Sequence, residues 1–185
     1  MKPVSDTAVQ RAYQVRIALF LISAFIGIFL LISIYRGIAT LDTLDQTERE
    51  RDRWQRPGDV IQALGLKDTN VVVDIGAGAG YFALKLSPIV GKHGSVVAVD
   101  ILKEPLLFLC IRSFLRNQWN IHTIHGLPNN PRLRVGSADA VLIANTYHEF
   151  TQPRSILDHV FQSTEARRAT SHSRPFAPIG CGGIP

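Results

Sequence analysis

The sequence predicts an α/β domain with a parallel β-sheet, attached to one membrane-spanning helix. Three observations carry this prediction. They are an uncharged apolar run near the N-terminus, an alternation of short apolar runs with helical patterns, and a glycine-rich turn directly after the first such run. The 185 residues leave room for one domain of ordinary size plus an attachment segment. With 46% hydrophobic and 19% charged residues, the chain is neither disordered nor collagen-like.

The formal net charge of +5 comes from scattered basic residues, without the run of basic and aromatic residues that a nucleic-acid groove needs. We therefore expect no nucleic-acid partner. Cys110 and Cys181 form neither a disulfide framework nor a metal quartet, and Cys110 lies in an apolar run that predicts a buried thiol. His122 and His125 have no cysteine or carboxylate nearby, so we expect no metal site.

A transmembrane helix is predicted over residues 17–35, after an N-terminal flank of residues 1–16. The run contains no charged residue, lies between Arg16 and Arg36, and is long enough to cross the ~30 Å hydrocarbon core of a bilayer. It has no polar face, which disfavours a core helix, and it exceeds the apolar region of a signal peptide. We expect a retained single-pass anchor. The flanking charges do not fix its orientation, so a cytosolic domain is expected only because that compartment supplies the ligand considered below.

Residues 36–56 are dense in charge and predict a solvated helical linker. The following domain is expected over residues 57–162. It opens with a short amphipathic helix carrying Val60, Ile61 and Leu64 on one face and ending at Gly65.

The segment Val71–Gly80, VVVDIGAGAG, reads as a buried parallel strand followed by a glycine-rich turn. Residues 81–90 then predict a helix, and Ser95–Asp100 predicts a second strand. Such a turn places backbone N–H groups and a helix N-terminus beside a ligand. The carboxylate of Asp100, about twenty residues after the glycines, is placed to accept hydrogen bonds from ribose hydroxyls.

The spacing of the glycines separates two classes of ligand. Dinucleotide-binding turns have G-x-G-x-x-G, in which the third glycine lets the helix approach the sheet beside a pyrophosphate. This chain has G-x-G-x-G, and Tyr81 stands where that third glycine would be. A nicotinamide or flavin site and a ligand-free turn stay open as alternatives.

The pattern resembles the first motif of class I S-adenosylmethionine-dependent methyltransferases. Residues 51–161 look like a group of small bacterial members of that family, which are Rossmann-like. The segments that carry the resemblance are DRWQRP, VVVDIGAGAGYFALKLSPIVG, SVVAVDI and ADAVLIANTYHEF. The cofactor that the resemblance implies is S-adenosylmethionine.

The resemblance also implies roles for individual residues. Gly76, Gly78 and Gly80 would pass close to the methionine part of the cofactor, and Asp74 would orient that part. Asp100 would bind the ribose.

Ile101 would pack on the adenine, and Asn145 would line the cofactor side of the pocket. Many relatives carry an acidic residue after the third strand that binds the adenine amino group. This chain has no carboxylate over residues 122–127, so the adenine contacts are expected to be weaker.

A fourth strand over residues 139–144 is followed by polar and aromatic residues that should line the pocket, because ligands of open α/β sheets bind at the carboxyl ends of the strands. His148 is a candidate general base with a pKa suited to neutral pH, and Tyr147 could orient an acceptor. Methyl transfer is an in-line displacement, so alignment alone can supply much of the rate and a base is optional. A purely structural His148 at the start of a helix stays an alternative.

The family pattern continues past residue 162 with a glycine-rich turn and further strands, which this chain lacks. Residues 153–162 predict a helix, whereas residues 163–185 read as an unrelated, disordered tail. We therefore expect a sheet that is incomplete at its C-terminal side, through truncation, with the fourth strand as an exposed edge. Cofactor binding and methyl transfer should be weak.

These patterns favour a membrane-anchored S-adenosylmethionine-dependent methyltransferase with impaired activity, whose acceptor is unknown and expected to be a small molecule. Whether the chain is an active enzyme is left open. One alternative is a non-catalytic membrane-anchored remnant that binds a ligand or a partner. A further one is an NAD(P)-binding enzyme.

Overall fold

The computed structural model describes residues 6–169 of the chain. The chain divides between Gln46 and Thr47 into two compact parts, of which the second contains the sheet. The first helix, α1 (Asp6–Gln55), forms the described portion of the first part and ends inside the second.

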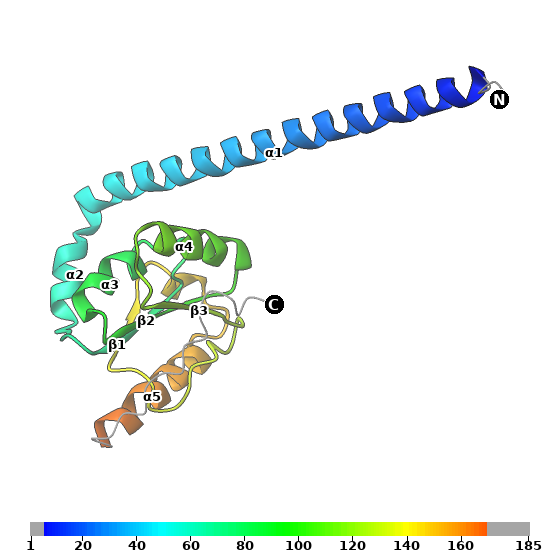
Figure 1. Ribbon diagram of the computed structural model, residues 1–185. Helices are drawn as coiled ribbons and strands as arrows, with labels where there is room; N and C mark the ends of the chain where they lie inside the picture. The colour runs from blue at the N-terminus through cyan, green and yellow to red at the C-terminus, as the bar shows by residue number, and fades with distance from the viewer. Residues whose placement is uncertain (1–5, 170–185) are drawn as a thin grey trace. The chain divides into compact units, whose positions relative to one another are not determined.

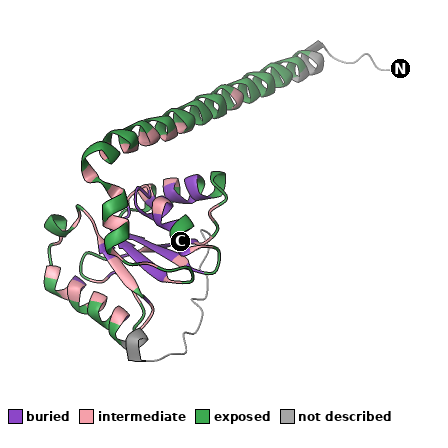
Figure 2. Ribbon diagram, turned by 90° about the vertical axis from the view of Figure 1, so that its left-hand side faces the viewer, coloured by how far each residue is buried: buried purple, intermediate pink, exposed green. Residues whose placement is uncertain are grey.

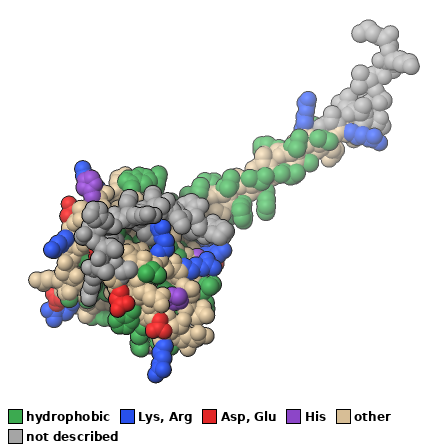
Figure 3. All heavy atoms as spheres, turned by 90° about the horizontal axis from the view of Figure 1, so that it is seen from below, with side chains coloured by type: hydrophobic (Ala, Val, Ile, Leu, Met, Phe, Trp, Pro, Cys, Tyr) green, Lys and Arg blue, Asp and Glu red, His purple; other side chains and the backbone are tan. Residues whose placement is uncertain are grey.

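The first part of α1 is long and apolar enough to cross a membrane, by length and composition. Hydrophobic side chains follow one another along it (Figure 3), and the large ones between residues 17 and 35 are exposed. The hydroxyls of Ser23 and Ser33 donate to the carbonyl oxygens of Phe20 and Phe29, so neither donor would enter lipid unsatisfied. The predicted helix over residues 17–35 is confirmed, and the crossing of a membrane stays a prediction.

Four parallel strands form the sheet in the described residues, in the spatial order β3–β2–β1–β4 (Figure 1). The strands are β1 (Val71–Ile75), β2 (Ser95–Asp100), β3 (Ile121–His125) and β4 (Ala140–Ile143). The chain moves outward from β1 to β2 and β3, and then returns to the other side of β1. A crevice therefore opens at the carboxyl end of β1, where the strand order reverses.

Helices connect β1 to β2 and β2 to β3, as the alternating sequence pattern predicts, whereas the described residues between β3 and β4 form no helix. The connecting helices are α3 (Ala83–Val90) and α4 (Lys103–Leu115). α2 (Pro57–Ala63) precedes β1, and the short 3₁₀ helix η1 (Tyr147–Glu149) and α5 (Pro153–Ala169) follow β4. α3 begins two residues later than expected, because Tyr81 and Phe82 belong to the turn after β1. It ends at Gly91, as expected.

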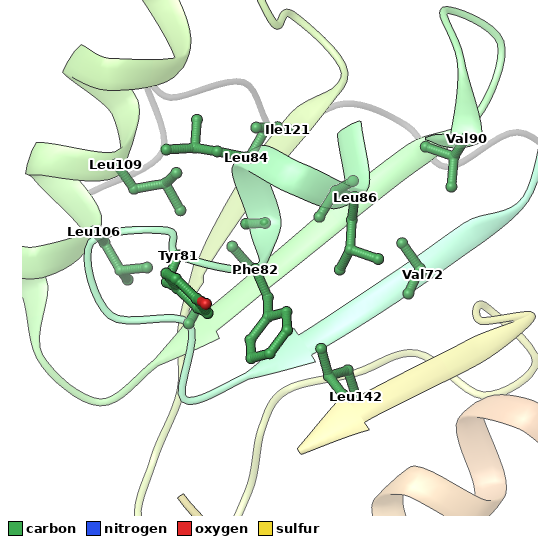
Figure 4. Packing of buried hydrophobic residues seen from close by; sticks show 14 residues of the cluster. Val72, Tyr81, Phe82, Leu84, Leu86, Val90, Leu106, Leu109, Ile121 and Leu142 are labelled. Carbon is green, nitrogen blue, oxygen red and sulfur yellow. The ribbon is translucent and has the colours of Figure 1, made fainter. Parts of the chain in front are cut away.

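Both faces of the sheet are covered, which explains the apolar character of every residue of β1 except one (Figure 2). On one face, Leu86 of α3 and Leu106 of α4 are fully buried against the strands, in the cluster shown in Figure 4. On the other face, Ile156 of α5 packs with Val73 and Val97. Cys110 is buried as expected, and Cys181 lies outside the described residues.

The fourth strand is an edge strand within the described residues, because β4 pairs only with β1. Two hydrogen bonds hold the start of β4 against β1. The N–H of Asp139 donates to the carbonyl of Val71, and its Oδ2 accepts from the N–H of Val71. The backbone N–H groups of Gly136 and Ala138 donate to the carbonyls of Gln162 and Ser163 in α5. α5 therefore holds the segment that leads into β4.

The expectation of a disordered tail from residue 163 onward is wrong for residues 163–169. α5 continues to Ala169, and Ser163 is completely buried and donates its hydroxyl to the carbonyl of Val160. The helix over residues 163–169 could not be predicted, because these residues show no apolar periodicity. The contacts that hold Ser163 come from its backbone and its hydroxyl. Residues 170–185 lie outside the described residues.

The expected solvated linker over residues 36–56 is helical, but its end is not simply solvated. Glu48 forms an ion pair with Arg112 of α4, and Asp52 accepts a hydrogen bond from the hydroxyl of Tyr81 at 2.7 Å. The side chains of Glu48 and Arg112 are only 13% and 3% exposed. The last turns of α1 are therefore part of the sheet domain.

Arg112 joins three segments of this domain. Its two terminal nitrogens each lie 2.7 Å from one carboxylate oxygen of Glu48, and Nη1 also donates to the carbonyl of Ala79 at 2.6 Å. Ala79 belongs to the glycine-rich turn. A buried charge that loses its partner is strongly destabilising, so this contact fixes both α1 and the turn to α4.

We predict that Glu48→Gln lowers the free energy of unfolding by about 3 kcal/mol, because it removes the carboxylate charge that both terminal nitrogens of the buried Arg112 guanidinium contact. The measurement is urea unfolding of the full chain in detergent micelles, followed by tryptophan fluorescence. Glu50→Gln, an exposed position two residues further along α1, is the control and should cost less than about 0.5 kcal/mol. Equal effects of the two variants would contradict the prediction.

Candidate functional site

A cavity of about 480 Å³ opens at the carboxyl ends of the strands. Its walls come from the residues that follow β1, β2, β3 and β4, together with one residue of α1 and the start of α5. The position agrees with the general placement of ligand sites in open α/β sheets. The sequence-predicted residues that line it are Gly76, Gly78, Asp100, Ile101 and Asn145.

The glycine-rich turn follows β1 closely, and two of its glycines are required by their neighbours. Gly76 has a φ of +76°, and a Cβ there would collide with the side chain of Thr146. Gly80 has a φ of +95°, and a Cβ there would collide with Leu109 of α4. Gly76 thus lets the segment after β4 approach the cavity, whereas Gly80 packs toward the core and is not among the lining residues.

The backbone N–H groups of this turn are used within the protein. Those of Gly76 and Ala77 donate to the carbonyl of Val99 in β2, at 2.8 and 3.1 Å, and that of Gly78 donates to Oδ2 of Asp100 at 2.8 Å. We expected these groups to lie free beside a ligand. A turn that already holds a carboxylate is a poor site for a pyrophosphate, which needs such N–H groups for itself.

Asp74 lies at the base of the turn and is 2% exposed. Its Oδ2 has no hydrogen-bond partner among the described residues. Burial raises the pKa of this carboxyl to about 7, the N–H of Ala83 opposes the shift, and the charges of Asp100 and Arg51 act in opposite directions. Asp74 is not among the residues that line the cavity, and an unsatisfied buried carboxyl is costly unless a donor reaches it.

Asp100 ends β2 at the mouth of the cavity. Besides Gly78, its carboxylate accepts the N–H of Leu102 at 2.9 Å through Oδ1, which holds the carboxylate at the end of the strand. Ile101 is 53% exposed and offers an apolar surface beside it. Nε2 of His125 lies 3.0 Å from the carbonyl oxygen of Ile101 and holds the backbone in place after β2.

The wall after β4 differs from the prediction. Asn145, Thr146 and Glu149 line the cavity, whereas Tyr147 and His148 do not. Tyr147 is 54% exposed and the His148 side chain 75% exposed. The reason is the 3₁₀ helix η1, which turns residues 147 and 148 outward and returns residue 149 to the cavity.

Two lining residues with charged side chains were missed by the sequence reasoning. Arg51 reaches the cavity from α1, and Glu149 from the end of η1. Arg51 lies directly before the DRWQRP segment, and it is the first residue of the range 51–161 that resembles the family, which was the available signal. Glu149 follows His148 directly, but the expected helical start gave no reason to choose between them.

His122 is buried in β3, where burial lowers its pKa, so it is part of the core. Within residues 6–169 no group of three histidine, cysteine or acidic side chains could hold a metal ion.

The family described as "Methyltransferase domain" matches residues 72–166, just over half of the chain. No curated protein matches it. Among solved structures, the chain is similar to a SAM-dependent methyltransferase from Aquifex aeolicus, with 26% identity and a TM-score of 0.57 over 64% of this chain and 65% of the other. The YcgJ protein from Bacillus subtilis is 25% identical, with a TM-score of 0.54 over 58% of this chain and 44% of the other.

The chain spans less than two thirds of the length of both solved structures. The match covers the sheet, the glycine-rich turn and α5, that is, the elements that build the cavity. The chain therefore belongs to the methyltransferase-domain family of the class I type, whose cofactor is S-adenosylmethionine.

Proposed function

We propose that this chain is a membrane-anchored methyltransferase that transfers the methyl group of S-adenosylmethionine to a small-molecule acceptor, with low activity. The observation that supports the cofactor site best is the pair of carboxyl groups at the glycine-rich turn. Asp74 is buried with an unsatisfied oxygen, and Asp100 stands at the mouth of the cavity.

The lining fits the parts of this cofactor. Asp100 is placed for the ribose hydroxyls, and Ile101 with Leu127 offers an apolar wall for the adenine. The turn at Gly76 and Gly78 leaves room for the methionine end, whose ammonium group would supply the donor that Asp74 lacks. The adenine wall carries no carboxylate after β3, which supports low affinity.

The bound cofactor supplies a methyl group on a positively charged sulfur, which an acceptor can attack in line. The protein aligns the acceptor with Asn145, Thr146 and Phe150 at the far wall of the cavity. We assign to Glu149 the proton-accepting role expected of His148, because Glu149 lines the cavity and His148 does not. Nε2 of His148 lies 3.8 Å from Oε1 of Glu149.

The first part of α1 supports the membrane anchor, and a cytosolic position of the domain follows from where the cofactor is made. The edge position of β4 supports the low activity, since η1 and the acceptor wall follow a strand that, within the described residues, pairs only with β1. Among the alternatives, a non-catalytic ligand-binding remnant would keep the cavity and lack turnover. An NAD(P)-binding enzyme is disfavoured by the occupied N–H groups of the turn.

We predict that S-adenosylmethionine at tenfold its Kd raises the melting temperature of the full chain by about 3 to 8 °C, whereas NADH at equal concentration does not. Asp100→Ala should abolish this shift, and Asp100→Asn should retain part of it because an amide oxygen still accepts from Gly78. Asp158→Ala, an exposed acid on α5, is the control. A shift by NADH alone would contradict the cofactor assignment, and a Kd in the low micromolar range would contradict low affinity.

The pKa of Asp74 gives a pH dependence of binding. Burial keeps its carboxyl protonated up to about pH 7 in the free protein, whereas a bound ammonium group favours the carboxylate. Affinity for S-adenosylhomocysteine should therefore rise about tenfold between pH 6 and pH 8, with proton release in calorimetry. Asp74→Asn should bind weakly with a flat profile, while Asp158→Asn should follow the wild-type profile. A flat wild-type profile would refute this role of Asp74.

The anchor is tested by placing charges in the apolar part of α1. The double variant Ile26→Arg and Phe29→Arg should release the chain from membranes in an alkaline carbonate wash, because each charge near the bilayer centre costs about 2.5 to 3.5 kcal/mol. Thr40→Arg, beyond residues 17–35, should leave the chain in the membrane pellet. Release of the wild-type chain by the same wash would rule out a spanning anchor.

A further inference from the structure

The outer face of α4 is apolar, although α4 already buries its inner face against the sheet. Leu106 and Leu109 are completely buried on the inner side, where α4 packs on β2 and β3 (Figure 1). The outer side of α4 and the turn after it carry large apolar side chains that are each 40 to 66% exposed, namely Leu107, Ile111, Phe114, Leu115 and Trp119. A helix that faces water normally carries polar residues on that side, so this face requires a physical explanation.

These five residues, called the α4 patch below, form one surface. Leu107, Ile111 and Leu115 are spaced four residues apart, and Phe114 follows Ile111 by three, so these four side chains lie on one side of the helix. The ring of Trp119 packs edge-on against the ring of Phe114, with the ring centres 5.3 Å apart. Single exposed apolar residues are common, whereas a continuous patch indicates an interaction surface.

The charges that border the α4 patch are mostly basic. Glu104, in the first turn, is the one acidic residue of α4. Residues 105–121 contain no acidic residue, whereas the exposed Lys103 and Arg116 lie at the two ends of the helix. An apolar helix face bordered by cations is complementary to an anionic lipid surface, and a tryptophan settles at the headgroup level of a bilayer.

The proposed anchor makes the bilayer the nearest large surface for this domain. Residues 36–46 separate the apolar segment from the part of the chain that contains the sheet, and as a helix they span only about 17 Å. A second copy of the chain is a poorer occupant, because a stable protein interface uses about 20 to 30 residues from each partner. A lipid surface needs no complementary shape, so the five residues of the patch are sufficient for it.

We propose that the α4 patch docks on the surface of an anionic lipid membrane, with its apolar side chains among the headgroups and the upper acyl chains. This inference rests on the anchor in the proposed function and adds a second contact with the same membrane. The anchor limits the distance of the domain from the bilayer, and the patch limits the rotation of the domain. Apolar helix faces of this kind enter about 5 to 10 Å into the boundary between headgroups and acyl chains.

The test measures contact between single tryptophans and lipid in the full chain. The chain is reconstituted in vesicles of equal parts phosphatidylcholine and phosphatidylglycerol, with or without bromine on the upper acyl chains, because bromine quenches tryptophan emission only at short range. The chain has two tryptophans. Trp54→Phe leaves Trp119, whereas Trp119→Phe leaves Trp54 as a reference outside the patch that is 65% exposed. Flotation of the same vesicles shows separately whether the chain is anchored.

We expect brominated lipid to remove roughly half or more of the Trp119 emission and less than about a tenth of the Trp54 emission. In the Trp54→Phe background, Phe114→Glu should lower the quenching of Trp119 to the level of Trp54, because its carboxylate disfavours burial in anionic lipid, while the chain still floats. Each variant is compared with itself in vesicles without bromine.

Phe161→Glu is the matched control in the same background. It makes the same change on α5, at a position that is 63% exposed and belongs to the helix on the other face of the sheet. It should leave the quenching of Trp119 unchanged. Both glutamate variants should melt within about 3 °C of their parent, since both replace exposed side chains.

Two results would overturn the inference while leaving the proposed function in place. The first is equal quenching of Trp119 and Trp54 in a chain that floats. The second is shielding of Trp119 from aqueous acrylamide without quenching by bromine, which would place a second copy of the chain on the patch. If the chain does not float with the vesicles, the anchor of the proposed function fails, and the docking of α4 fails with it.

Discussion

One buried guanidinium constrains the rest of the structure. Arg112 lies on α4 beneath the glycine-rich turn and needs an anion, because an isolated charge cannot remain in such a place. Glu48 supplies that anion from a helix that lies far earlier in the chain, and the carbonyl of Ala79 takes a further N–H. The turn, α1 and α4 are thus joined by a contact that needs all three. Ala79 belongs to the same turn as Gly76 and Gly78, which line the cavity.

The charges around the cavity act as a second constraint, on the ligand. Asp100 uses the N–H of Gly78, which a phosphate would need, and burial raises the pKa of Asp74 to about 7. The carboxylate of Asp100 disfavours an anion at the N–H of Gly78. The same fold can serve dinucleotides or a sulfonium cofactor, and the placement of two carboxyl groups distinguishes these uses.

Much of the fold could be predicted because it depends on local patterns. β-branched runs located the strands, and Asp100 followed from its position at the end of β2. Arg51 and Glu48 could not be placed in the same way, since a charged segment predicts a solvated helix unless its distant partners are known. The exclusion of the His148 side chain from the cavity depends on a single 3₁₀ turn, and such a short turn has no periodic pattern in the sequence that could predict it. The helix over residues 163–169 was not predicted, because backbone hydrogen bonds hold it and these do not depend on the type of side chain.

The integration of residues 47–55 into the sheet domain changes where this domain starts. The family match begins at residue 72, and a fragment cut at that boundary for expression without the apolar segment would lose Glu48 together with the helix that carries it. Arg112 would then be buried in a domain that had lost its counter-ion, and the fragment would tend to aggregate although its sheet sequence is intact. A soluble fragment should retain the chain from residue 47 onward. The same reasoning applies to relatives whose limits are drawn from sequence similarity alone, since a helix outside the shared region can be needed for folding.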